Sequence, residues 1–227
     1  MMTPATLIAD RKAIVFDLDG TLLDTVADIR QAMSDALVER GCAALPPDYM
    51  PPNLHGAFPG ALMAMMAQQG TPEAEHEAVI AAYTRRYAER AHRSSRPYPG
   101  LPAFLADCRR RGVGLGVCTN KRHAPAVQAL QQCGILHYFD HVSGCDTVAR
   151  PKPDPLPLLE ACAALGATPR QAAYVGDTHV DAASAAAADM PFLLFRSGYG
   201  SPLVHDYPIA AVFDDYAELW QADALPM

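Results

Sequence analysis

The sequence predicts an α/β protein with a Rossmann-like, doubly wound parallel sheet as its core and an all-α cap domain inserted into that core. Two observations predict the sheet: short apolar runs recur along the chain, and helical stretches alternate with them as in βα units. A third observation predicts the insertion, because the segment between the first and second apolar runs, residues 17–112, lacks a strong strand pattern.

The strand candidates are continuous apolar runs, which is typical of parallel strands buried on both faces. They are AIVF (13–16), VGLGVC (113–118), the region of FDHVSG (139–144), AAYVG (172–176) and PFLLF (191–195). Helices are expected between them, at LPAFLADCRRRG (101–112), APAVQALQQCG (124–134), PLPLLEACAALG (155–166) and DAASAAAAD (181–189). Each of the first three helices ends on a glycine, which predicts a left-handed C-cap there.

The inserted segment has the periodicity of amphipathic helices. Residues 25–41 and 72–92 are predicted to form two long helices, and GALMAMMAQQG (60–70) a shorter one. The Pro- and Gly-rich stretch RPYPGLP (96–102) then returns the chain to the βα pattern. We therefore expect a core domain made of residues 1–23 and 97–227, and a helical cap domain made of residues 24–96.

Composition excludes several classes of protein. Of the 227 residues, 50% are hydrophobic and 19% charged, which is enough apolar surface for a globular core. The net charge of −7 and the lack of a basic run argue against nucleic-acid binding. No leader or membrane-spanning pattern is present, and the six cysteines are scattered without metal-ligand spacing. The sequence predicts a cytoplasmic protein with no membrane or nucleic-acid partner, as a monomer or homodimer.

Polar side chains follow several of the predicted strands, where active sites of open α/β sheets are found. A turn alone could explain the two acids of FDLDG. Polar residues, however, follow three of the predicted strands, and a loop lysine accompanies them. Carboxylates suit a hard cation such as Mg²⁺, and a hydroxyl, an amide and an ammonium suit phosphate oxygens. The residues are Asp17 and Asp19 of FDLDG, Thr119 and Asn120 of VCTNK, Lys152 of RPKPDP, and Asp177 and Asp181 of GDTHVD.

These motifs resemble those of the haloacid dehalogenase superfamily, specifically its phosphoglycolate-phosphatase-like branch with a helical cap. The matching segments are DLDGTLLDT (17–25), the strand that ends in Thr119, Lys152 of RPKPDP, and GDTHVD (176–181). The resemblance extends over essentially the whole chain, including the position of the cap. It implies a Mg²⁺-dependent phosphatase that hydrolyses a small phosphomonoester.

The resemblance also implies roles for individual residues. Asp17 would attack phosphorus to form an aspartyl-phosphate, and Asp19 would protonate the leaving alkoxide and then activate water. The side chains of Asp17 and Asp177 and the backbone carbonyl of Asp19 would bind Mg²⁺. Thr119 and Asn120 would hold the phosphoryl oxygens. Lys152 would offset negative charge on nucleophile and phosphate, and Asp181 would orient Lys152 or a metal-bound water.

Two relatives of this branch are disfavoured. The dehalogenases lack an acid at the position of Asp19, so its presence favours phosphoryl transfer over cleavage of a carbon–halogen bond. The phosphonate-cleaving branch uses a lysine in the cap, and no lysine occurs here between Lys12 and Lys121. A phosphomutase of the β-phosphoglucomutase type and a catalytically idle regulatory protein on the same fold remain alternatives.

Substrate specificity is expected to lie in the cap. His55 in NLHGAFPG is the candidate for a cap loop that reaches the substrate, and Arg150 could bind a substrate carboxylate, although a solvent salt bridge is an alternative. His179 could face the site, and Arg196 with the SGYG loop (197–200) is expected at its entrance. Phosphoglycolate, sugar phosphates and nucleoside monophosphates all remain open as substrates.

Overall fold

A computed structural model describes residues 3–200 and 202–219. It contains a six-stranded parallel sheet in the order β5-β4-β1-β6-β7-β8. The first strand therefore lies inside the sheet and later strands add on both sides of it, as in a doubly wound fold. This confirms the predicted fold class. The strands are β1 (Ala13–Phe16), β4 (Gly114–Cys118), β5 (His141–Ser143), β6 (Ala172–Gly176), β7 (Phe192–Phe195) and β8 (Ala211–Phe213).

Strand β8 was not predicted from the sequence. It is three residues long, pairs only with β7 along one side, and exposes Val212. A short edge strand of this kind has too few residues to give a periodic signal, so the pairing with β7 decides its conformation. Helix α1 (Pro4–Ala9), which Thr3 caps, was also not predicted.

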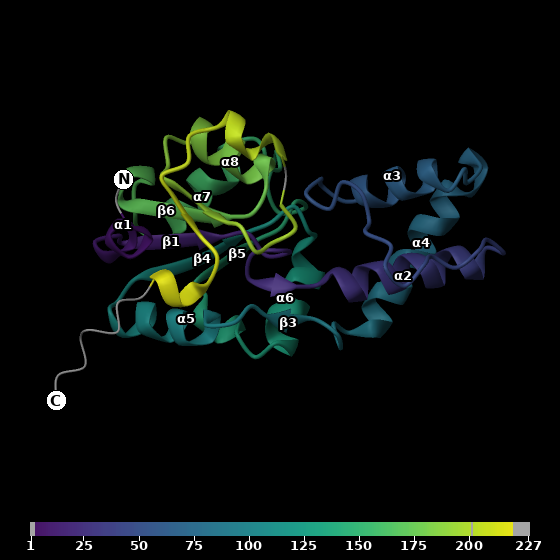
Figure 1. Cartoon of the computed structure of the whole chain (residues 1–227), viewed down its shortest axis with the longest axis horizontal. Helices are drawn as coiled ribbons and strands as arrows, with labels where there is room; N and C mark the ends of the chain where they lie inside the picture. The colour runs from purple at the N-terminus through teal and green to yellow at the C-terminus, as the bar shows by residue number, and fades with distance from the viewer. Residues whose placement is uncertain (1–2, 201, 220–227) are drawn as a thin grey trace.

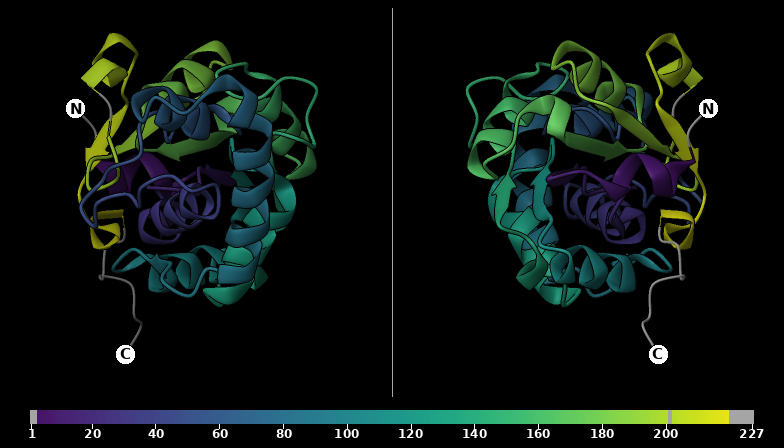
Figure 2. Two further views of the ribbon diagram at one scale, coloured as in Figure 1. Left: turned by 90° about the vertical axis from the view of Figure 1, so that its right-hand side faces the viewer. Right: turned by 90° about the vertical axis from the view of Figure 1, so that its left-hand side faces the viewer.

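Helices cover both faces of the sheet (Figure 1). Along β1, Ile14 and Phe16 pack into one apolar cluster, whereas Ala13 and Val15 pack into another on the opposite face. The first cluster is closed by α1, α5 (Leu101–Arg110) and α6 (His123–Gln132), and the second by α7 (Leu156–Ala164) and α8 (His179–Ala187). Figure 2 shows the sheet between these two layers.

Backbone details at the helix ends agree with the sequence. Gly112, Gly134 and Gly166 follow α5, α6 and α7 with φ of 74°, 72° and 64°, so the predicted left-handed C-caps are confirmed. Helix α8 begins at His179, two residues before the predicted start. Thr178 and Asp181 form a capping box there, so the helix starts earlier than its run of alanines suggests.

Three helices between β1 and α5 form the inserted segment, which lies at one end of the sheet (Figure 1). They are α2 (Val26–Glu39), α3 (Gly60–Gln68) and α4 (His76–Arg90), and they enclose an apolar cluster of their own that includes Met33, Leu62 and Met66. The chain leaves and re-enters the core through an antiparallel pair, β2 (Leu23–Asp24) with β3 (Arg96–Pro97). The exact domain boundaries stay a prediction. The β2–β3 pair lies at both of the predicted boundaries.

The remaining helical segments are short 3₁₀ turns, at Glu73–Glu75, Leu136–Tyr138, Pro169–Gln171, Pro202–Asp206 and Tyr216–Leu219. Within the described part of the chain, no helix combines the length and the apolar character that crossing a membrane would require.

Candidate active site

The site forms where three neighbouring strands end. Asp17 follows β1, Thr119 follows β4 and Asp177 follows β6, and β4, β1 and β6 are adjacent in the sheet. Because parallel strands all point the same way, their last residues meet at one edge. The expected grouping of carboxylates and a hydroxyl at this edge follows directly from the strand order.

Asp17, Asp177 and Asp181 form a buried acidic cluster, in which oxygens of the three carboxylates lie within 4.8 Å of one another. Lys152 joins them, with its Nζ 2.9 Å from Asp17 Oδ1 and 2.6 Å from Asp181 Oδ1. A single ammonium leaves two of the three negative charges without a counter-ion if all the carboxylates are ionised.

The pKa values show this excess of negative charge. Burial, together with the charge of Asp181, raises the pKa of Asp17 to about 7, although Lys152 opposes the shift. Burial and the neighbouring carboxylates raise the pKa of Asp177 well above its usual range. Carboxyl oxygens that lie this close together and are buried from water suit a divalent, oxygen-preferring cation, which would neutralise the excess charge. The residues present therefore fit Mg²⁺.

Asp181 is held by the protein on both of its oxygens. Oδ1 accepts from Lys152 and from the hydroxyl of Tyr174 at 2.8 Å, and Oδ2 accepts from the Thr178 amide and hydroxyl. Burial opposes the charge of this carboxylate, but Lys152 and the hydrogen bonds lower its pKa below the ordinary value. This network fixes the Lys152 ammonium beside Asp17, which fits the orienting role expected for Asp181.

Asp177 is fixed by a second set of donors. Its Oδ1 accepts from the Thr21 hydroxyl at 2.8 Å, and its Oδ2 from the Tyr199 amide at 2.8 Å. The approach of the 197–200 loop is close enough to require glycine, since a Cβ on Gly198 would lie 2.2 Å from the Gly20 carbonyl oxygen. Gly20, at φ 86°, is likewise too close to Asp177 for a side chain.

Asp19 lies on the cap side of the cluster and has different partners. Its Oδ1 accepts from the Thr25 hydroxyl at 2.5 Å, and both oxygens lie 3.0 Å from Nζ of Lys121. The Lys121 ammonium is also 4.8 Å from the ring centroid of Tyr87 on α4. A core lysine and a cap tyrosine thus meet at the predicted general acid.

Asn120 links the cap to the core. Its Nδ2 donates to the carbonyls of His55 at 3.1 Å and Lys152 at 3.0 Å, so both amide hydrogens already have acceptors. The imidazole of His55 packs edge-on against that of His179, with the ring centroids 4.6 Å apart. Burial and the proximity of His179 lower the pKa of His55. The structure therefore brings the cap loop over the site, as expected for His55; its contact with a substrate stays a prediction.

The structure does not bring two of the proposed arginines to the site. Arg150 is largely exposed and pairs with Asp154 at 3.1 Å, which is the solvent salt bridge considered as its alternative. Arg196 is also exposed and pairs with Asp214. By contrast, the neighbouring SGYG loop does border the site, because the Tyr199 hydroxyl accepts from the Thr25 amide at 2.7 Å.

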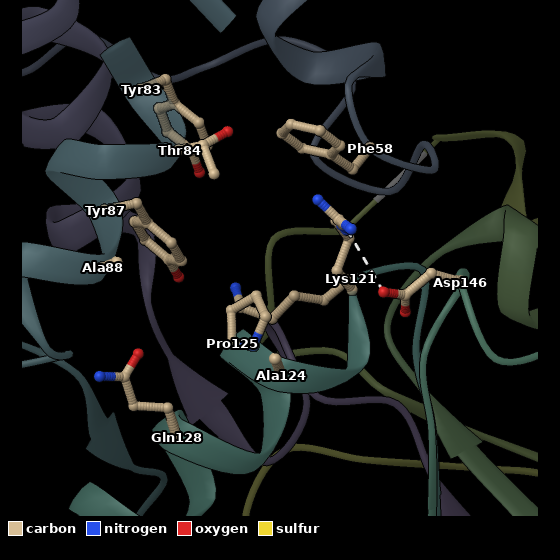
Figure 3. Close-up of a pocket in the computed structure, with 11 residues that line it drawn as sticks. Phe58, Tyr83, Thr84, Tyr87, Ala88, Lys121, Ala124, Pro125, Gln128 and Asp146 are labelled. Atoms are coloured by element: carbon tan, nitrogen blue, oxygen red, sulfur yellow. Dashed lines mark hydrogen bonds and ion pairs between the residues drawn. The ribbon is translucent and has the colours of Figure 1, made fainter. Parts of the chain in front are cut away.

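Two cavities lie between cap and core and share Phe58, Tyr83 and Lys121 in their walls. The smaller, of about 70 Å³, is lined by Asp19 and Asn120. The larger, of about 490 Å³, opens beyond Tyr87 and is bounded on the core side by Pro125 and Gln128 (Figure 3).

Sequence reasoning missed the residues that hold the acids in place. Tyr174 reads as one more apolar residue of a buried strand, and Tyr199 as part of a flexible glycine-rich loop. Lys121 carried a usable signal, because it follows Thr119 and Asn120 directly and is one of few lysines in the chain.

Residues 14–195 match the family model of the haloacid dehalogenase-like hydrolases. The chain belongs to this family. The match spans β1 to β7 and includes every residue of the acidic cluster. The predicted family is thereby confirmed. The acidic cluster lies at the carboxyl ends of the strands, within the matched residues.

Relatives of this hydrolase include phosphoglycolate phosphatases. That of Cereibacter sphaeroides strain ATCC 17025 is 36% identical over 91% of this chain and 94% of its own, and that of Rhodospirillum rubrum is 36% identical over 92% and 89%. Among solved structures, a predicted phosphoglycolate phosphatase from Haemophilus somnus 129PT superposes with a TM-score of 0.83 at 26% identity, covering 93% of this chain and 97% of its own.

Proposed function

We propose that this hydrolase is a Mg²⁺-dependent phosphatase that cleaves a small phosphomonoester through an aspartyl-phosphate on Asp17. The enzyme class, a phosphoric monoester hydrolase, is supported by the family and by relatives at 32–36% identity over most of the chain. The observation that carries the proposal is the buried cluster of Asp17, Asp177 and Asp181 around Lys152, next to Asp19.

Asp17 is the nucleophile in this mechanism. Lys152 fixes one of its oxygens, and an ammonium 2.9 Å away offsets the repulsion between the carboxylate and an incoming phosphate dianion. Bond formation between a carboxylate oxygen of Asp17 and phosphorus releases the alkoxide and leaves the phosphoryl group on Asp17. In this mechanism the Thr119 hydroxyl would bind a phosphoryl oxygen, and the Lys152 ammonium would offset negative charge on the nucleophile and the phosphate.

Asp19 is the acid and base. Thr25 and Lys121 hold its carboxyl on the cap side of the cluster, where the organic part of the substrate must lie. It gives a proton to the leaving alkoxide, and then removes a proton from the water that attacks the aspartyl-phosphate. The cap excludes other water, since the His55 loop covers the site through Asn120.

The metal would be held by the carboxylates of Asp17 and Asp177, with the Asp19 carbonyl as the further protein ligand expected from the family pattern. When bound, Mg²⁺ supplies charge neutralisation between the phosphate and the acidic cluster. Thr21 and the Tyr199 amide keep the Asp177 carboxylate in place for this role.

The substrate we propose is phosphoglycolate or a sugar phosphate of similar size. The relatives named as phosphoglycolate phosphatases support the first of these substrates. The phosphomutase and the idle protein remain the alternatives, and each predicts a different outcome in an assay.

The test measures inorganic phosphate released from phosphoglycolate, glucose 6-phosphate and p-nitrophenyl phosphate, with Mg²⁺ and with EDTA. We expect release that requires Mg²⁺ and that is lost in Asp17→Asn, while the circular dichroism spectrum of the variant is unchanged. Interconversion of sugar phosphates without phosphate release would instead support a mutase. A folded protein that releases no phosphate from any ester would support the idle alternative.

A further inference from the structure

Lys121 is a buried cation that the proposed mechanism does not use for chemistry. Its side chain is 8% exposed and lies between Asp19, 3.0 Å from both carboxylate oxygens, and the face of the Tyr87 ring. Burying an ammonium costs free energy that one partly buried carboxylate offsets only in part. Its position at the cap–core boundary therefore calls for a second partner.

The smaller cavity lies directly against this ammonium. Among the described residues that line it, Asp19 and Lys121 are the charged ones, and the cap contributes apolar and aromatic groups such as Leu54, Phe58 and Tyr83. The cavity thus presents one available cation to whatever binds beside the general acid.

No arginine is among the described residues that line this cavity. Arg85 and Arg86 pair with Glu39, and Arg90 pairs with the buried carboxylate of Asp28. Arg40 pairs with Glu75 on the surface. The cation at the cavity comes from the core, two residues after Thr119.

We propose that Lys121 binds a carboxylate on the leaving group, and that the enzyme therefore selects short phosphomonoesters whose alcohol carries a carboxylate. This inference rests on the proposed phosphatase function and adds to it the residue that recognises the substrate. An ammonium has three donors, so Lys121 can bind a substrate carboxylate without releasing Asp19. The leaving alcohol is then held between its carboxylate contact and the acid that protonates it.

The size of the cavity supports a short alcohol. It measures about 70 Å³, against about 490 Å³ for the second cavity. Phe58 and Tyr83 line both cavities, and Figure 3 shows them on the cap side of the larger one.

The experiment compares two esters of matched size, phosphoglycolate and 2-hydroxyethyl phosphate, in which a hydroxymethyl group replaces the carboxylate. The ratio of their kcat/KM values is measured for the wild type, for Lys121→Gln and for Arg122→Gln. Arg122 is the matched control, because it is the adjacent cation in sequence but is half-exposed and pairs with Asp146 at 3.3 Å.

We expect the wild type to prefer phosphoglycolate, and Lys121→Gln to reduce this preference by about tenfold to a hundredfold, the range of one charge-assisted hydrogen bond. Arg122→Gln should leave the preference unchanged. An equal loss on both esters in Lys121→Gln would overturn the inference, because it would mean that Lys121 only positions Asp19.

A wild type that prefers the neutral ester would also overturn the inference, and this measurement does not depend on a variant that folds. Failure of the proposed function is distinguishable. In that case the wild type would release no phosphate from either ester or from p-nitrophenyl phosphate in the presence of Mg²⁺.

Discussion

Lys152 stabilises the site because it sits between two buried carboxylates. Its Nζ contacts Asp17 and Asp181 and lies 2.7 Å from the Tyr174 hydroxyl, and burial alone would favour the neutral amine. The carboxylates outweigh burial and raise the pKa of Lys152 above its ordinary value, so the residue stays an ammonium. The same pairing makes the residue important for stability.

Lys152→Met should lower the free energy of unfolding by about 3–5 kcal/mol, because it leaves buried carboxylates without their cation. It should also remove phosphatase activity. Urea denaturation in EDTA, compared with Lys12→Met at an exposed position, measures the effect on stability. A loss of less than about 1 kcal/mol would mean that the carboxylates are protonated in the metal-free protein.

His92 is a second residue whose pKa is strongly shifted, in this case by burial. Its side chain is 1% exposed, and no described residue pairs with its Nε2. Burial, with a smaller effect of Lys121, lowers the pKa of His92 to about 4. In the unfolded chain a histidine has a pKa near 6.5, so between these values only the unfolded state binds the proton.

Stability should therefore fall as the pH falls from about 6.5 towards 4, and His92 should contribute up to about 3 kcal/mol of that loss. Above pH 6.5 this contribution is fully present. His92→Asn removes the titrating group and tolerates the left-handed φ of 56°. Urea denaturation at pH 7.5, 6 and 4.5 should show a shallower pH dependence in the variant. Parallel curves for the two proteins would contradict the predicted contribution.

At the scale of elements, the loop after β7 completes the proposed metal site. Residues 197–200 return across the strand ends so that the Tyr199 amide reaches Asp177, and the Tyr199 hydroxyl reaches the Thr25 amide at the start of α2. Gly198 permits this approach, because its Cα lies where any Cβ would contact Gly20 and Asp177. One loop thereby connects Asp177, the proposed metal ligand, to the first cap helix.

Gly198→Ala should displace this loop and lower kcat/KM by roughly tenfold to a hundredfold, since small displacements of positioning groups have effects of this size. The matched control is Gly134→Ala, at φ 72° with open space around it. The control should cost about 1 kcal/mol of stability without a change in activity. Equal activities for the two variants would show that the loop has no part in the site.

At the scale of the whole molecule, two structural units meet at a polar boundary. The sheet with its helices forms one unit around β1, and α2, α3 and α4 form another, and the site lies where they face each other. Polar contacts cross this boundary, among them the hydrogen bond from Asn120 to the His55 carbonyl and the approach of the Lys121 ammonium to the Tyr87 ring. Such a boundary allows the cap to open for substrate and close for chemistry.

Mg²⁺ should raise the melting temperature of the whole protein, because only the folded chain gathers the acidic cluster. Binding at about a hundred times the dissociation constant adds about 2.7 kcal/mol of stability. Differential scanning calorimetry with MgCl₂, against NaCl at equal ionic strength, measures the shift. Asp177→Asn should abolish it, and an equal shift in this variant would place the metal elsewhere.

The sequence by itself determined the sheet and the residues at its edge. Continuous apolar runs specify buried parallel strands, and the polar residues directly after β1, β4 and β6 are fixed at that edge by chain connectivity alone. Asp17, Thr119 and Asp177 could therefore be assigned to one site without coordinates. The helix C-caps could also be predicted from the local sequence, because a positive φ depends on a single glycine.

Only the tertiary structure decided the partners of these residues. The pairing of Lys121 with Asp19 and the bond from Asn120 to the cap loop join segments that are distant in the chain. Strand β8 likewise depends on its neighbour rather than on its own three residues. A long side chain can pair with any of several partners. The distances and the burial that decide between these partners depend on how the cap packs on the core.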